Sequence, residues 1–234
     1  MTEHDGYDGD DGHEAHHAEP EAAHAEPEFT EPDPGPGPDL FGRPDADTAE
    51  ATAAPEDIAR WHEQQAHDTC AVVGQEFLID RFTGVDHTEE ELVAVAEAEG
   101  WYRPGGGTPI DDVGNLLEHY GVPVERSEGE TLDGLASALS DGAGVLVAVD
   151  GDEILAADPE SQQLADRMGV PDQGADHVVQ VIGIDRDDPD HPQVILNDPG
   201  RPDGAGLEAP EREFLAAWED SGRFTVTAGG SRHA

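Results

Sequence analysis

Apolar side chains recur at regular spacing only from Ile58 onward, and the way they recur changes along the chain. In the first half of this region they lie three or four residues apart, which is the spacing of amphipathic helices. In the second half they form short β-branched runs, which are typical of buried strands. Helices followed by strands predict an α+β fold instead of a regular alternation of strand and helix.

The expected helices have recognisable ends. Thr88 and Glu91 have the spacing of a capping box, and Gly100 can end the helix that they open. Pro109 is suited to the first turn of another helix. We expect helices from Cys70 to Phe82, from Thr88 to Gly100, from Thr108 to Gly121, around Leu132 to Leu139, and from Arg212 to Asp220. We expect strands at Val145 to Val149, His177 to Ile184, Val194 to Leu196 and Phe224 to Thr227.

The first 56 residues consist mainly of Asp, Glu, His, Ala, Gly and Pro. Such a segment cannot bury enough apolar surface to offset the entropy of ordering it. We therefore expect a disordered acidic tail, rich in His and Pro, over residues 1–56, and one folded domain over residues 57–230. Five tail histidines lie among carboxylates and could bind a transition metal weakly, but we expect a solvated segment and no metal site: His4, His13, His16, His17 and His24.

The composition limits the partners and the compartment. A formal net charge of -44 at pH 7 disfavours binding to nucleic acid or to an anionic membrane. All 11 basic residues are arginine, which excludes lysine-dependent phosphate loops and Schiff bases. A single cysteine, no apolar leader and no stretch of about 18 apolar residues predict a cytoplasmic protein without a membrane span.

Three residues are candidates for chemistry. Cys70 begins a helix that Asp68 or Thr69 can cap, and a helix N-terminus lowers the pKa of a thiol. His177 and Asp198 stand at the ends of two predicted strands, and neighbouring strands would bring the carboxylate to the imidazole. Taken singly, each has a simpler interpretation: a buried cysteine, a solvated histidine and a turn aspartate. Together they are typical of a thiol hydrolase.

The sequences around these residues resemble a known family. The segments Gln64 to Cys70, Asp176 to Asp185 and Val194 to Gly200 are similar to family thirty-nine of the cysteine peptidases, which removes double-glycine leaders from bacteriocins. The resemblance covers roughly residues 60–228 and is closest to stand-alone, peptidase-like members. It implies a papain-like fold, in which N-terminal helices pack on an antiparallel sheet.

The resemblance also implies roles for particular residues. Cys70 would be the nucleophile, His177 the general base and then acid, and Asp198 the residue that orients the imidazole. Gln64 falls where the family keeps a glutamine that stabilises the oxyanion, and Gln65 is the neighbouring alternative. One such donor contributes on the order of 3 kcal/mol to the stability of the transition state. The implied activity is cleavage of a peptide or leader amide bond, with a peptide or protein as substrate and no cofactor.

The sequence departs from the family beside the nucleophile. The family commonly has Asp-Cys-Gly, whereas this chain has Thr69-Cys70-Ala71, and the methyl group of Ala71 could narrow the site. This leaves a rival hypothesis, a catalytically inactive module that binds peptides on the same fold. The polar segment from Glu153 to Gln173 precedes His177 and is a candidate lid over the site, while Gly105 to Gly107 is expected to be a flexible connection.

Overall fold

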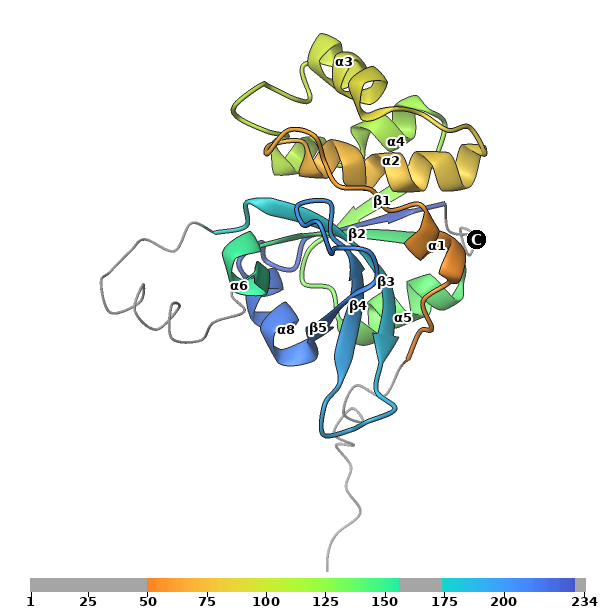
Figure 1. Cartoon of the computed structure of the whole chain (residues 1–234), viewed down its shortest axis with the longest axis vertical. Helices are drawn as coiled ribbons and strands as arrows, with labels where there is room; N and C mark the ends of the chain where they lie inside the picture. Colours follow the sequence, from red (N-terminus) through yellow and green to blue (C-terminus); the bar gives the residue numbers. More distant parts are fainter. Residues whose placement is uncertain (1–49, 156–173, 230–234) are drawn as a thin grey trace, which may run out of the picture. The chain divides into compact units, whose positions relative to one another are not determined.

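The computed structural model describes residues 50–155 and 174–229, which form a sheet between two layers of helices (Figure 1). Helices α2, α3 and α4 cover one face, and α5 and α8 cover the other. The helices are α1 (Pro55–Ala59), α2 (Cys70–Thr83), α3 (Glu89–Glu99), α4 (Asn115–His119), α5 (Leu132–Ser140), α6 (Gly151–Leu155) and α8 (Glu211–Glu219), with one 3-10 turn, η1 (Ile110–Asp112).

All six described strands pair antiparallel, in the order β1-β6-β2-β3-β4-β5. The strands are β1 (Val124–Ser127), β2 (Gly144–Val149), β3 (His177–Asp185), β4 (Gln193–Asn197), β5 (Leu207–Pro210) and β6 (Thr225–Ala228). The predicted α+β class, with N-terminal helices packed on an antiparallel sheet, is confirmed.

Strand β2 shows why the central strands read as continuous apolar runs. Leu146 and Ala148 pack in the core beneath α2 and α3, whereas Val145, Val147 and Val149 pack in the core beneath α5 and α8. Because helices cover both faces of the sheet, every residue of this strand is buried. Strand β3, the neighbour of β2, is buried from residue 178 to residue 184 for the same reason.

The predicted start and end of the helix from Thr88 to Gly100 are confirmed in α3. The Thr88 side chain accepts a hydrogen bond from the Glu91 backbone N–H, and the Glu91 carboxylate accepts one from the Thr88 backbone N–H. Gly100 then ends the helix in the left-handed conformation, with φ of 83°. The capping box and the glycine stop therefore lie where the sequence placed them.

The prediction of a single helix from Thr108 to Gly121 is wrong. The structure has η1, an interruption, and then the short helix α4. Gly114 causes the interruption because its φ is 100°, outside the right-handed helical region. The side-chain oxygen of Gln75 accepts hydrogen bonds from the backbone N–H groups of Gly114 and Leu116, so helix α2 satisfies the donors that the break leaves open.

The periodicity of the sequence did not reveal strands β1 and β5 or helices α1 and α6. Both strands are four residues long and form the edges of the sheet, where burial on two faces is not required. Only one of the eight residues of these strands, Ala209, is buried. Without a buried run or a clear alternation, the sequence carried little strand signal here.

The division at residues 56 and 57 stays a prediction. The structure adds that Ala51 pairs with Ile184 of β3 and is buried, and that α1 begins at Pro55. Residues 1–49, with the five tail histidines, lie outside the described residues, as does most of the candidate lid, residues 156–173. Within the described ranges, no helix is long and apolar enough to cross a membrane.

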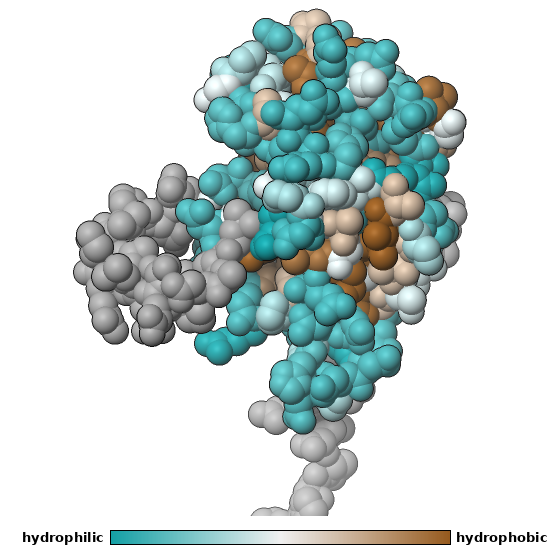
Figure 2. All heavy atoms as spheres, viewed as in Figure 1, coloured by the Kyte–Doolittle hydropathy of each residue, from teal (hydrophilic) through white to brown (hydrophobic). Residues whose placement is uncertain are grey.

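The described surface is largely polar. In Figure 2 the layer that contains α2 and α3 is mostly hydrophilic. Among the described residues, Val85 and Ile110 are the large hydrophobic side chains that remain exposed. Ile110 lies beside the candidate site, so its exposure is relevant to what that site binds.

Candidate active site

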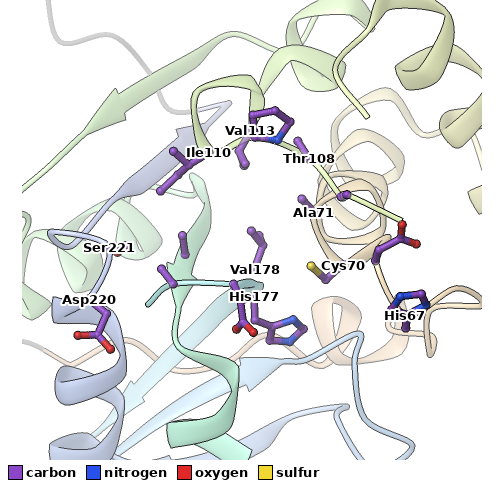
Figure 3. A pocket seen from close by; sticks show the side chains of 17 residues that line it. His67, Cys70, Ala71, Thr108, Ile110, Val113, His177, Val178, Asp220 and Ser221 are labelled. Carbon is purple, nitrogen blue, oxygen red and sulfur yellow. The ribbon is translucent and has the colours of Figure 1, made fainter. Parts of the chain in front are cut away.

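Cys70 is the first residue of α2, as the sequence predicted. It is a free, partly exposed cysteine in the helical layer, and it faces a cavity between this layer and the sheet (Figure 3). The N-cap is Thr69, although its side chain makes no capping hydrogen bond to the helix. The thiol therefore lies at the positive end of a 14-residue helix.

One buried carboxylate, that of Glu89, holds the loop that leads into Cys70. Its Oε2 accepts a hydrogen bond from the backbone N–H of Gln65 at 2.8 Å, and its Oε1 accepts one from the hydroxyl of Thr69 at 2.6 Å. Glu89 is the first residue of α3 and is only 4% exposed. A contact between α3 and this loop thus fixes the approach to the thiol.

His177 and Asp198 meet because β3 and β4 are neighbours. The antiparallel register pairs Gln180 with Asn197, so the start of β3 lies beside the turn that follows β4. The Asp198 Oδ1 lies 2.7 Å from the His177 Nε2, and the Asp198 side chain is fully buried. The expected proximity of the two strand ends is therefore present.

Backbone contacts hold the carboxylate of Asp198 in place. Its Oδ1 also accepts a hydrogen bond from the Gly200 N–H at 2.8 Å. The Asp198 backbone N–H donates to the Gly204 carbonyl, and the indole N–H of Trp61 donates to the Asp198 carbonyl at 2.7 Å. The turn after β4 is thereby fixed on both sides of the aspartate.

Two glycines in this turn leave room for the site. A Cβ on Gly200 would lie 2.9 Å from the His177 Cε1, so a larger residue would displace the ring. A Cβ on Gly204 would overlap the carbonyl of Asp198. The glycines are needed because the backbone passes against the imidazole and against the aspartate.

The environment of His177 favours its protonated form. Burial opposes the charge on the ring, but the hydrogen bonds to Asp198 and to Cys70 outweigh it and raise the pKa of His177 to about 10. The Nε2 faces Asp198, so Nδ1 is the nitrogen that remains for the thiol. A charged imidazole beside a thiol is the arrangement that activates cysteine nucleophiles.

The two candidate glutamines are placed differently. The Nε2 of Gln64 donates to the Ala66 carbonyl at 2.7 Å, and its backbone N–H donates to the Pro199 carbonyl. The side-chain oxygen of Gln64 is buried without a hydrogen-bond partner. Gln65 is exposed, and its backbone N–H is bound to Glu89. Neither lines the cavity, so the assignment of an oxyanion donor stays a prediction.

The cavity beside Cys70 has a volume of about 600 Å³. Figure 3 shows Cys70 and His67 on one side, Asp220 and Ser221 on the other, and Ile110, Val113 and Val178 between them. Ala71, the residue that departs from the family pattern, also lines the cavity and is 3% exposed. Among residues 50–155 and 174–229, no group of three or more His, Cys, Asp or Glu could hold a metal ion.

Several residues of this site escaped the sequence analysis. Neither Glu89, which falls within the helix expected from Thr88 to Gly100, nor Trp61 was singled out. Their contacts join segments 24 and 137 residues apart, for which a single sequence carries no signal. Asp220 was expected to end a helix, and this position was the only sign in the sequence that it would lie beside a turn.

The chain was compared with known proteins. No family model matches it. Two curated relatives, uncharacterized proteins of Mycobacterium bovis and Mycobacterium tuberculosis, are each 28% identical over 206 residues, which cover 76% of this chain and 85% of theirs. A solved C39-like peptidase from Bacillus anthracis is 14% identical, with a TM-score of 0.53 over 75% of this chain and 96% of that one. The chain has the fold of a C39-like peptidase.

A second solved structure belongs to a double-glycine-motif protease of an AMS/PCAT transporter, in complex with its leader peptide. It is 9% identical, with a TM-score of 0.47 over 80% of this chain and 97% of that one. The Bacillus anthracis structure confirms the predicted likeness to C39-like peptidases at the level of the fold. The C39-like fold brings together the three residues on which the family resemblance depended, Cys70, His177 and Asp198.

Proposed function

We propose that this protein is a thiol-dependent peptidase in which Cys70, His177 and Asp198 form the catalytic triad. The observation that carries the proposal is geometric: the His177 Nε2 lies 2.7 Å from the buried Asp198 carboxylate, and His177 lines the same cavity as Cys70, the first residue of α2. Burial opposes a charge on the ring, but the hydrogen bonds to Asp198 and Cys70 raise the pKa of His177 to about 10. A structural histidine on an apolar strand would need neither a buried carboxylate on one side nor a thiol on the other. The C39-like fold supports the same assignment.

In the proposed reaction the Cys70 thiolate attacks the carbonyl carbon of a substrate amide, and the carbonyl oxygen takes the negative charge. The backbone N–H of Cys70 and the side-chain amide of Gln64 are the proposed donors to this oxygen. The Gln64 amide nitrogen donates to Ala66, so its second N–H is the one that remains for the oxyanion.

Protonated His177 then gives its proton to the leaving nitrogen, the C–N bond breaks, and an acyl group remains on the Cys70 sulfur. His177, now neutral, removes a proton from water, which attacks the thioester and releases the second product. The proton returns to His177, and the thiolate is restored. Asp198 holds the ring through its Nε2 in both half-reactions.

The test is the pH dependence of iodoacetamide labelling at Cys70, measured by mass spectrometry in the native chain and in His177→Ala. Rapid labelling well below pH 8.5, the ordinary pKa of a thiol, is expected in the native chain, and slow labelling in the variant. Equal rates in the two proteins would overturn the proposal and favour the inactive binding module. Because Cys70 is the sole cysteine, the labelled site is unambiguous.

A further inference from the structure

The loop between α1 and α2 connects the two sides of the candidate site, and His62 lies in the middle of this connection. Just before His62, the indole N–H of Trp61 donates to the Asp198 carbonyl. Just after it, the backbone N–H of Gln64 donates to the Pro199 carbonyl. Both hydrogen bonds tie the loop to the turn that holds the carboxylate of the candidate triad.

The His62 side chain ties the same loop to α2, the helix that begins with Cys70. Its Nε2 lies 3.1 Å from the Oε1 of Glu76, which belongs to this helix. Its ring packs edge-on against that of Phe77, with 5.4 Å between the ring centroids. His62 therefore connects the helix that carries the thiol to the turn that carries Asp198.

The contacts of the His62 ring favour its charged form. Its Nδ1 lies 3.2 Å from the carbonyl oxygen of Glu63, while its Nε2 faces the carboxylate of Glu76. Both oxygens are acceptors, and only a protonated imidazole can offer a donor to each of them. When the ring loses its proton, one of the two contacts is left without a donor.

The ionised form of Glu76 depends in turn on the charge of His62. Glu76 is only 4% exposed, and its Oε2 is buried with no hydrogen-bond partner among the described residues. Such a carboxylate is costly to ionise unless a cation lies beside it. Burial raises the pKa of Glu76, and the contact with Glu76 raises the pKa of His62. The other charged groups around the pair are Arg60, Glu63, Asp80, Asp86 and Glu89.

We propose that His62 is a positioning residue of the peptidase site, because its charge holds the helix that carries Cys70 in place beside the turn that carries Asp198. The inference rests on the proposed peptidase function and adds to it a residue outside the triad. The ion pair with Glu76 would exist only while His62 is protonated and Glu76 is ionised. The rate at Cys70 would then depend on two protons besides that of His177.

The direction of the pH dependence follows from the two raised pKa values. The pair is lost as the pH rises through the pKa of His62, which is raised above 6.5. At the acid end it is lost as the pH falls through the pKa of Glu76, which is raised above 4.5. His177, with a pKa of about 10, keeps its charge near neutral pH. A change of rate there therefore does not come from His177.

The experiment measures the rate constant of Cys70 alkylation by iodoacetamide from about pH 5.5 to about pH 8.5, by mass spectrometry on the full chain. The native chain is compared with His62→Gln, with Glu76→Gln and with His62→Arg, which keeps a cation at every pH. The ratio of two rates at one pH cancels the titration that both proteins share. His191→Gln is the matched control, because His191 lies 2.9 Å from a carboxylate in the exposed turn between β3 and β4.

We expect the native chain to react roughly threefold faster than His62→Gln and Glu76→Gln at about pH 6, and the ratio to approach one at about pH 8.5. His62→Arg should keep the faster rate across this range, which a role in packing alone would not produce. His191→Gln should match the native chain throughout. If His62→Gln does not fold, the pH dependence of the ratio for Glu76→Gln decides the question.

Ratios within about 1.5-fold of one at every pH would overturn the proposal, as would a ratio that does not change with pH. The failure of this inference differs from that of the peptidase proposal. If His177→Ala slows labelling while the ratios for His62→Gln and Glu76→Gln stay at one, the peptidase proposal stands and the role of His62 falls. If His177→Ala labels as fast as the native chain, both fall, because His62 then has no activated thiol to position.

Discussion

The two sides of the candidate site are held by different kinds of contact. On the sheet side, the register of β3 and β4 and the backbone of the turn after β4 fix His177 and Asp198. On the helical side, the loop before Cys70 depends on one buried side chain from another helix, Glu89. The sheet side holds the imidazole and its carboxylate directly, whereas Glu89 acts on the thiol only through the loop before it, so substitutions on the sheet side should have the larger effects.

The largest effect is expected on the sheet side, for Asp198→Asn. Asparagine keeps the shape but removes the charge, so the pKa of His177 falls and the ring loses its charge near neutral pH. The rate of Cys70 alkylation by iodoacetamide at pH 6 should fall at least about tenfold. Asp190→Asn, in the exposed turn between β3 and β4, is the matched control. An unchanged rate would mean that Asp198 does not maintain the charge on His177.

Gly200→Ala tests whether the backbone of the turn positions the imidazole. The new methyl group would lie 2.9 Å from the His177 Cε1, so the ring has to shift away from the thiol. We expect alkylation at pH 6 to slow roughly fivefold, because small displacements at a reacting centre have large effects on rate. Gly106→Ala, whose Cβ would have contacts no closer than 3.7 Å, should react normally. Equal rates in the two variants would contradict this account.

On the helical side, Glu89→Gln should have a smaller effect. Glutamine has one side-chain oxygen and no charge, so this oxygen can accept the hydrogen bond from Gln65 or the one from Thr69. The two hydrogen bonds to a charged carboxylate are lost. We expect alkylation to slow about threefold and the free energy of unfolding in urea to fall by about 1 kcal/mol. Exposed Glu90→Gln is the control. A fall in alkylation rate as large as that of Asp198→Asn would show that the helical side is as important as the sheet side.

The pH dependence of the free energy of unfolding tests the charge on His177, which belongs to the sheet side of the site. The pKa of His177 is about 10 in the folded chain against an ordinary 6.5, so the folded chain binds this proton more tightly than the unfolded chain does. The resulting stabilisation is complete below about pH 6.5 and is lost as the pH rises to about 10. Urea unfolding should therefore show stability falling across this window in the native chain and a flatter curve in His177→Gln. Parallel curves would refute the raised pKa.

The smallest effect is expected for Thr88→Ala, which removes the capping box of α3 and leaves Glu89 in place. Loss of an N-cap side chain costs about 1 kcal/mol of stability. Urea unfolding should register this loss, whereas Cys70 alkylation at 25 °C should keep its rate. A slower alkylation would show that the position of α3, and not the charge of Glu89, is what the loop before Cys70 requires.

The sequence predicted those parts of the molecule that depend on local pattern. Helix α2 could be recognised from its apolar spacing, although the Thr69 side chain does not cap it, and β3 could be recognised because both of its faces are buried. Predicting the contact between His177 and Asp198 required one further assumption, that consecutive strands are neighbours in the sheet. The pairing of β3 with β4 confirms this assumption. The fold class and the candidate triad could thus be inferred before the structure.

The parts that could not be predicted depend on contacts between distant residues. The break at Gly114 is stable because Gln75, 39 residues earlier, accepts its N–H. The edge strand β5 exists because β4 pairs with it, and its own four residues give no clear alternation. The hydrogen bond from Gln65 to the Glu89 carboxylate and the one from the Trp61 indole to Asp198 also join residues that are far apart in the sequence. A single sequence does not show which of its distant residues are in contact.

The contacts of Trp61 also set an order of events during synthesis. The segment before Cys70 is tied to the turn after β4 by the hydrogen bond from Trp61 to Asp198 and by the one from Asn197 to Asp57, which span 137 and 140 residues. A chain grows from its N-terminus, so Cys70 and its helix leave the ribosome long before Asp198 does. The thiol therefore stays without its histidine and aspartate neighbours until the turn after β4 has been synthesised, and a nascent chain that ends before Asp198 cannot assemble the candidate triad.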